Sequence, residues 1–175
     1  RRLAEELTVA DKVESIVVIG SEGSAVELMG SFEGNVVVYS LNPYYVQDNE
    51  VRHELMHIAD RLNPEFRFDF ADASLAVDDY PPARKAYPKV RISRWTLLNE
   101  LWNINIDGRL RGRGIPRHLR YASFVATVRY FARLSAAECR ALYRGLWTDE
   151  LVSYPDLKRE TDMLLYEQNH TRPHT

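Results

Sequence analysis

The hydrophobic pattern of this chain changes near residue 40, and this change restricts the fold more than any other feature. Before it lie a β-branched run at 15–19, an alternating segment at 25–29 and a second β-branched run at 36–39, all separated by turn residues. From Asn49 onward, apolar residues recur at helical spacing. We therefore expect an α+β fold with a small, mostly antiparallel N-terminal sheet and a helical remainder.

The first long helix is predicted to begin at Asn49, which is suited to an N-cap, and to end near Leu62 because Pro64 follows. A long irregular stretch is expected from Glu65 to about Arg91. The other predicted helices are 93–110, 116–134, 135–147 and 148–168, with a capping box at Ser135 and a new start near Pro155. We expect one domain over 1–134, with 135–175 as a helical extension packed on it.

The first predicted helix carries the pattern H-E-x-x-H, from His53 to His57. Histidines four residues apart lie on one helical face, so both imidazoles can reach the same metal ion. Glu54 follows the first histidine, where a carboxylate can take a proton from a water bound to that metal. Zinc suits two neutral imidazoles and a third N or O ligand. The spacing therefore predicts His53 and His57 as metal ligands and Glu54 as a general base.

A third ligand is sought in the helix predicted over 93–110. Glu100, Asn103 and Asp107 follow each other at spacings of four or fewer residues, on one face of a Trp- and Ile-rich helix. If that face is buried, its polar groups need partners, and a metal with its surrounding hydrogen bonds would supply them. A polar stripe that merely faces water is the alternative. Three other histidines occur, at His118, His170 and His174.

Composition excludes several classes of protein. The formal net charge is -2, so no global basic field favours nucleic acid, and the local arginines from Arg109 to Arg120 are typical of a solvated helix end. Cys139 is the single cysteine, which fits a reducing, cytoplasmic location. The sequence contains no apolar run of 18 residues, so no membrane-spanning helix is expected. The N-terminus is too polar for a signal peptide. The lack of an initial Met suggests a fragment or a processed form.

Two families of metallopeptidase share this motif. Metzincins extend it with a glycine and a third histidine, but Asp60 and Asn63 occupy those positions here. Over about residues 15–110 the chain instead resembles the gluzincins, most closely the small single-domain minigluzincins. In that family an H-E-x-x-H helix supplies two histidines and a following glutamate helix supplies the third ligand. Larger gluzincins have an aspartate four residues after that glutamate, whereas Ile104 stands there in this chain.

The resemblance implies a zinc peptidase in which Glu100 is the third ligand and Asp107 supports a histidine, or in which Asp107 is itself the ligand. It also implies that substrate binds as an extra strand beside 36–39. A donor to the oxyanion would help the reaction. The sequence does not choose among the candidates for that donor, which are Arg117, His118, Arg120 and Tyr121.

The expected function is hydrolysis of peptide bonds in a peptide or protein substrate, with Zn²⁺ as the cofactor. The alternative is a metal-binding but non-hydrolytic or latent interaction module, in which the segment 65–91 covers the cleft or the C-terminal helices dock a partner. A nucleic-acid accessory role through the arginine cluster is a third hypothesis, and steep salt dependence of binding would support it. Sequence alone predicts neither the cleavage preference nor the oligomeric state.

Overall fold

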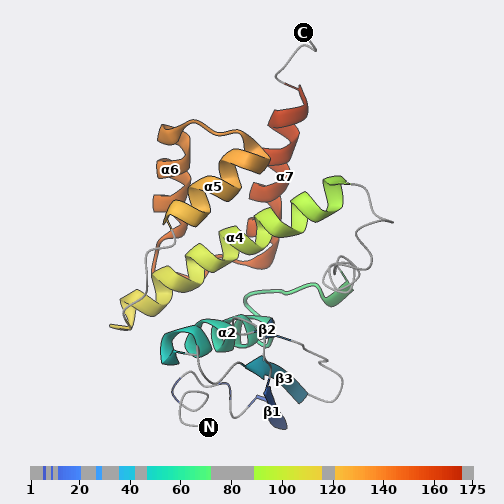
Figure 1. Ribbon diagram of the computed structural model, residues 1–175, viewed down its shortest axis with the longest axis vertical. Helices are drawn as coiled ribbons and strands as arrows, with labels where there is room; N and C mark the ends of the chain where they lie inside the picture. Colours follow the sequence, from blue (N-terminus) through green and yellow to red (C-terminus); the bar gives the residue numbers. More distant parts are fainter. Residues whose placement is uncertain are drawn as a thin grey trace. The chain divides into compact units, whose positions relative to one another are not determined.

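Helices make up most of the residues that the computed structural model describes (Figure 1). Those residues are Glu6, Val9, 12–20, 27–28, 36–41, 47–71, 89–115 and 121–170. The elements are β1 (Ser15–Gly20), β2 (Glu27–Leu28), β3 (Val36–Leu41), α2 (Asp48–Arg61), α4 (Lys89–Gly112), α5 (Tyr121–Ala132), α6 (Ala136–Leu146) and α7 (Tyr154–His170). They fall into two compact units, 1–64 and 65–175. The division at 134 expected from the sequence stays a prediction.

The strands of the first unit form a small sheet in the order β1-β3-β2. β1 pairs with β3 in parallel along its whole length, from Ser15 opposite Val36 to Gly20 opposite Leu41. β2 pairs with β3 in the antiparallel sense over two residues only. β3 is therefore the middle strand, but β2 pairs only with Tyr39 and Ser40, so the expectation that substrate binds beside 36–39 stays a prediction.

The predicted α+β fold with a mostly antiparallel sheet is wrong. Parallel pairing dominates the described strands, and helices dominate the described part of the chain. Strand existence follows from local residue preference, but the direction of pairing depends on how a connection returns to the sheet. The connections from β1 to β2 and from β2 to β3 lie outside the described residues. No strand is found beyond residue 110 among the residues described there.

The helix α2 begins at Asp48, one residue before the predicted start. Its N-cap is Gln47 and not Asn49, and the Gln47 backbone N–H donates to Glu50 Oε2 at 3.2 Å. This reciprocal use of the third helical residue is a capping box. The helix ends at Arg61, where the Leu62 N–H still donates to Ile58 O at 3.0 Å, one residue before the predicted end. Inside α2, Leu55, Met56 and Ile58 are buried.

The second unit is organised around α4, which packs against α5, α6 and α7. Every residue of α4 from Leu101 to Leu110 is buried, which is typical of a helix enclosed on all sides. Leu101, Trp102 and Ile106 are all fully buried. α4 also starts four residues before, and ends two residues after, the predicted bounds of 93 and 110.

The connection between α6 and α7 runs closely along α4. The buried Asn105 amide donates to Leu146 O at 3.2 Å and to Glu150 O at 3.0 Å, and its oxygen accepts from the Val152 N–H at 3.3 Å. A Cβ on Gly108 would lie only 2.5 Å from Thr148 O. Gly108 is therefore the point of α4 at which the backbone of the α6–α7 connection approaches most closely, and only glycine leaves room for it.

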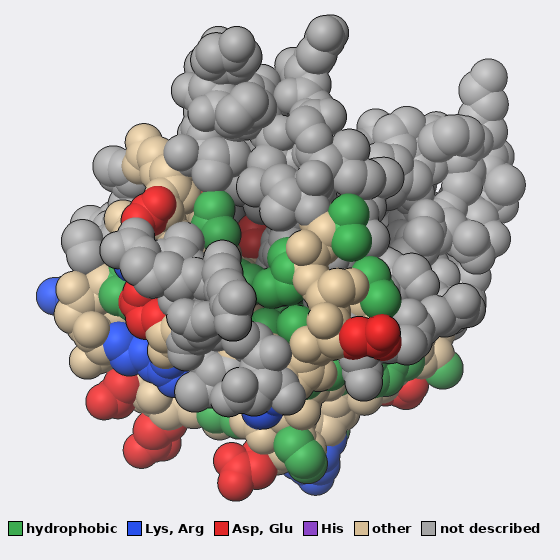
Figure 2. All heavy atoms as spheres, turned by 90° about the horizontal axis from the view of Figure 1, so that it is seen from below, with side chains coloured by type: hydrophobic (Ala, Val, Ile, Leu, Met, Phe, Trp, Pro, Cys, Tyr) green, Lys and Arg blue, Asp and Glu red, His purple; other side chains and the backbone are tan. Residues whose placement is uncertain are grey.

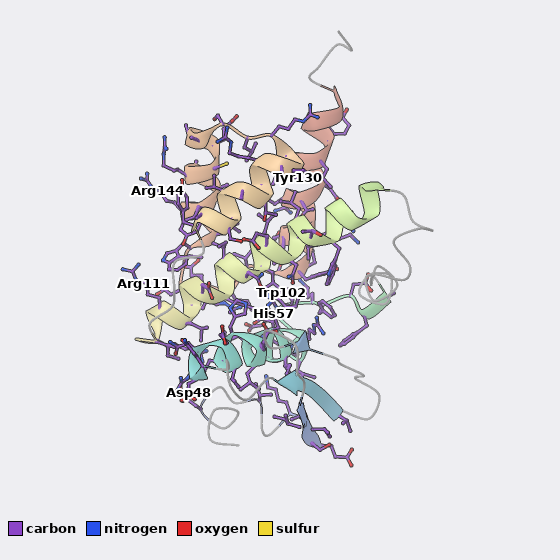
Figure 3. All side chains as sticks on the ribbon, viewed as in Figure 1. Asp48, His57, Trp102, Arg111, Tyr130 and Arg144 are labelled. Carbon is purple, nitrogen blue, oxygen red and sulfur yellow. The ribbon has the colours of Figure 1, made fainter. Side chains whose placement is uncertain are left out.

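Residues 66–70 follow α2 and belong to the second unit, where they pack on α4 and the start of α7. The ring of Phe66 stacks on Trp102, which Figure 3 labels on α4, with centroids 4.9 Å apart. The Tyr154 N–H donates to Phe66 O at 2.8 Å, and Arg67 donates to Ser153 Oγ at 3.1 Å. Part of the predicted irregular stretch is thus fixed by an aromatic core, while 72–88 lies outside the described residues.

Candidate metal centre

The histidine pair lies in the middle of α2, where the helix is regular on both sides. His53 and His57 are buried, with exposed fractions of 1% and 5%, and Glu54 between them is half-buried. Helical geometry places the two histidines one turn apart on the same face. The predicted helix therefore delivers the predicted residues to one place.

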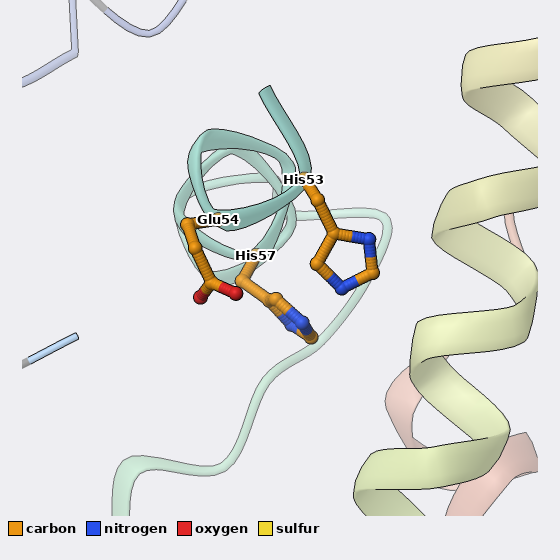
Figure 4. Close-up of side chains that lie close together, drawn as sticks. All are labelled: His53, Glu54 and His57. Atoms are coloured by element: carbon orange, nitrogen blue, oxygen red, sulfur yellow. The ribbon is translucent and has the colours of Figure 1, made fainter. Parts of the chain in front are cut away.

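The three side chains lie close enough to share one ion. One nitrogen of each imidazole and one carboxylate oxygen of Glu54 lie within 4.8 Å of one another. The imidazole rings have centroids 5.0 Å apart and planes inclined by 74°. Figure 4 shows both rings leaving α2 on the same side, with the Glu54 carboxylate beside His57.

The donor set decides which metals fit. Two imidazole nitrogens with a nearby carboxylate suit zinc and other borderline divalent metals better than calcium or magnesium, which prefer oxygen ligands. Donor atoms within 4.8 Å of one another need only small side-chain rotations to reach one ion, since metal–ligand bonds to zinc are about 2.0–2.2 Å long. The group His53, Glu54 and His57 can therefore hold a metal ion.

Arg52, the residue before the first histidine, forms an ion pair with Glu6. Arg52 Nε lies 3.0 Å from Glu6 Oε1, and Arg52 Nη2 lies 3.1 Å from Glu6 Oε2. The hydrogen bond to Glu6 is the main reason that the pKa of Arg52 is raised, and burial opposes it. This pair links the N-terminal part of the chain to α2, a contact that the sequence analysis did not anticipate.

The candidate third ligands lie on α4, in the second compact unit. Glu100 is half-buried, whereas Asn103 and Asp107 are buried. The polar stripe seen in the sequence therefore does not simply face water, and the alternative of a solvated stripe is wrong at these two positions. The choice between Glu100 and Asp107 stays a prediction.

Of the other predicted site residues, some lie in the described part of the chain and the rest lie outside it. Tyr121 begins α5, and its ring meets the ring of Tyr143 edge-on, with centroids 5.0 Å apart. Arg109 is buried, whereas Arg111 and Arg113 are exposed, so the arginine run is not one continuous surface. The remaining candidates lie outside the described residues: Arg117, His118, Arg120 and His174, together with the side chain of His170.

The described part of one face of the molecule carries charges of both signs (Figure 2). On the described part of the face in Figure 2, Lys and Arg side chains lie among Asp and Glu side chains.

Among the helices described, none combines the length and the hydropathy needed to cross a membrane.

The sequence and the structure were compared with known proteins. Neither protein-family models, nor curated proteins, nor solved structures gave a match.

Proposed function

We propose that the chain is a zinc-dependent peptidase, with His53 and His57 as metal ligands and Glu54 as the general base. The observation that carries this proposal is the position of Glu54, whose carboxylate oxygen lies within 4.8 Å of a nitrogen on each imidazole. A base must be close to the water that it deprotonates. A carboxylate at the edge of a two-histidine site meets this requirement.

Zinc, when bound, acts as a Lewis acid that polarises a carbonyl group and lets water react near neutral pH. The protein supplies the proton transfers. Glu54 takes a proton from the attacking water while the water oxygen bonds to the scissile carbonyl carbon. Glu54 then gives that proton to the leaving amine as the C–N bond breaks. His53 and His57 bind in their neutral form, because a protonated imidazole has no lone pair for a metal.

The third ligand is proposed from the resemblance to gluzincins and from side-chain length. Glu100 has the longer side chain of the two candidates, and it follows Asn99 as in the larger members of that family. Asp107 would then accept a hydrogen bond from a ligand imidazole and fix its tautomer. The burial of Asp107, with an exposed fraction of 0%, supports a role inside the protein and not on its surface.

A metal-binding but non-hydrolytic or latent module is the second candidate. The exposed fractions of 1% for His53 and 5% for His57 favour it, because a substrate carbonyl must reach the metal between them. A peptidase with this site therefore needs an opening that admits an extended peptide. The two candidates differ in what they predict for the parent protein: a peptidase cleaves an unfolded substrate, and a non-hydrolytic or latent module binds zinc without cleaving it.

The test replaces Glu54 with Gln, which keeps the size of the side chain but removes its basicity. Hydrolysis of a reduced, alkylated protein substrate is measured together with zinc content. We expect Glu54→Gln to retain zinc and to lose about 10²- to 10⁴-fold in rate, the usual contribution of a general base. Glu150→Gln, on an exposed residue of the second unit, is the matched control and should cleave like the parent.

Two results would overturn the peptidase proposal. One is a Glu54→Gln variant that cleaves as fast as the parent, which would show that Glu54 is not the base. The other is a parent protein that binds zinc stoichiometrically and yet cleaves no unfolded substrate. The second result would support the non-hydrolytic or latent module.

A further inference from the structure

One face of the helix α7 carries a hollow of about 580 Å³. The described residues that line it all belong to α7 and are Pro155, Lys158, Arg159, Asp162, Met163 and Tyr166. Their spacing alternates between three residues and one, so they form a single stripe along about three turns of the helix. The opposite face of α7, with Leu157 and Leu164, is buried in the second unit. Two neighbours in the stripe, Met163 and Tyr166, are 47% and 61% exposed, and apolar surface beside charged residues is typical of a binding surface.

The charges of the stripe are complementary to each other when two copies of α7 run antiparallel. A two-fold axis between positions 160 and 161 places Arg159 of each copy opposite Asp162 of the other, so the same ion pair forms twice. In a parallel arrangement each residue would lie beside its own equivalent. Arg159 would then face Arg159, and Lys158 would face Lys158, and these like charges would repel. Charge therefore selects the antiparallel arrangement.

The apolar residues of the stripe also find partners about this axis. Met163 lies opposite Lys158, whose aliphatic stem can cover the thioether while its ammonium group stays in water. Tyr166 lies opposite Pro155, so the apolar body of the phenol meets an apolar ring. Each copy thus covers the apolar surface that the other exposes.

The present contacts of the two charged residues leave room for these new ones. Arg159 is 69% exposed, and its Nη2 atom lies 2.9 Å from Asp156 Oδ1 in the same helix, a kind of pair that contributes little. Asp162 accepts hydrogen bonds from Arg94 at 2.7 and 3.2 Å, and an ionised carboxylate has about four acceptor sites. Asp162 can therefore bind Arg94 and the Arg159 of a second copy together.

We propose that this stripe of α7 is a docking surface for a second copy of the same chain, in an antiparallel dimer with two-fold symmetry. The inference goes beyond the proposed metal site and does not depend on it. Two helix faces of about three turns bury less surface than the roughly 1,200–2,000 Å² of stable interfaces, so the dimer forms reversibly and its amount depends on concentration.

The test reverses one charge in each of two variants, Arg159→Asp and Asp162→Arg. Alone, each variant places like charges opposite each other, and we expect the dissociation constant of its dimer to rise by at least about tenfold. Mixed in equal amounts, the two variants restore both ion pairs across the axis, and the dissociation constant should return to within about threefold of the parent value. Sedimentation velocity from about 5 to about 500 μM measures the association, with thermal unfolding recorded for each variant.

Tyr166→Ser tests the apolar part of the surface without changing a charge. The dimer of this variant should dissociate about tenfold more readily, as when a buried aromatic anchor is lost. Tyr130→Ser is the matched control, because Tyr130 is a tyrosine of α5 that is 77% exposed and lies outside the stripe. The control should associate like the parent.

Three results would overturn the inference. The first is a parent that stays monomeric at about 500 μM, which is also the result expected if the stripe binds a different protein or a small molecule. The second is a dimer that persists unchanged in Arg159→Asp and Tyr166→Ser, which would place the contact elsewhere. The third is loss of the dimer in both charge variants with no recovery in their mixture. If Asp162→Arg does not fold because it loses Arg94, then Arg159→Asp and Tyr166→Ser still decide the outcome.

Discussion

The imidazole rings of His53 and His57 lie with their centroids 5.0 Å apart and meet at 74°, edge to face. Both are buried, and the Glu54 carboxylate reaches the same point from the next position along α2. Four-residue spacing on a helix produces this proximity without any help from the rest of the chain. The core of the candidate site is therefore a local property of α2.

Substitution of Gly108 by Ala should destabilise the protein by about 1–3 kcal/mol, the usual range for overpacking. The new Cβ would lie 2.5 Å from Thr148 O and 2.8 Å from Thr148 N, and backbone atoms cannot rotate away as side chains do. Gly145→Ala in α6 is the control, because a Cβ there meets nothing within 4 Å. That variant should gain up to about 1 kcal/mol from helix propensity. Urea unfolding of both variants measures the free energy of unfolding, which should fall in Gly108→Ala and rise in Gly145→Ala.

The start of α7 should respond to acid through Asp156. The pKa of this carboxyl is lowered below its ordinary value of 3.8, first by the hydrogen bond from Ser153 and less by Arg159, while burial opposes the shift. A lowered pKa gives stability that is present above pH 3.8 and is lost as the pH falls through the folded-state value.

We therefore expect Ser153→Ala to raise the pKa of Asp156 more than Arg159→Gln does. Carboxyl chemical shifts followed by NMR from pH 6 to about pH 2 measure both, across the range in which aspartates titrate. A larger rise in Arg159→Gln would show that the ion pair, at 2.9 Å, and not the hydroxyl, holds the carboxylate.

The third ligand can be assigned by two variants. If Glu100 binds the metal, Glu100→Ala should abolish tight zinc binding, and Asp107→Ala should weaken it by only about 10- to 100-fold, as for residues that support a ligand. Isothermal titration with zinc measures both affinities. The reverse order would make Asp107 the ligand, and negligible effects in both would exclude α4 as its source.

Local patterns in the sequence predicted local structure well. The i, i+4 histidines, the capping box at Ser135 and the new helix start beside Pro155 all occur as expected, because each depends on residues within one or two turns. The Glu138 N–H donates to Ser135 Oγ at 3.3 Å, which closes that box. The start of α2 was misplaced because Gln47 is an uncommon cap and Asn49 a common one.

Features that depend on distant partners were not predictable in the same way. The parallel pairing of β1 with β3 is set by the return of the chain to the sheet, and no residue in either strand specifies it. Asn105 is an ordinary polar residue in the sequence. In the structure it is buried, and its side chain forms hydrogen bonds with the α6–α7 connection, more than 40 residues later. Glu6 likewise looks ordinary in the sequence, yet it accepts a hydrogen bond from Arg52, 46 positions later.

The central claim is that His53 and His57 bind one zinc ion per chain. Metal analysis of the purified protein after zinc loading and desalting tests it most directly, with the His53→Ala, His57→Ala double variant measured beside the parent. The variant His118→Ala controls for the loss of a histidine elsewhere. We predict one zinc in the parent and in His118→Ala, and none in the double variant. Full zinc occupancy in the double variant would contradict the account.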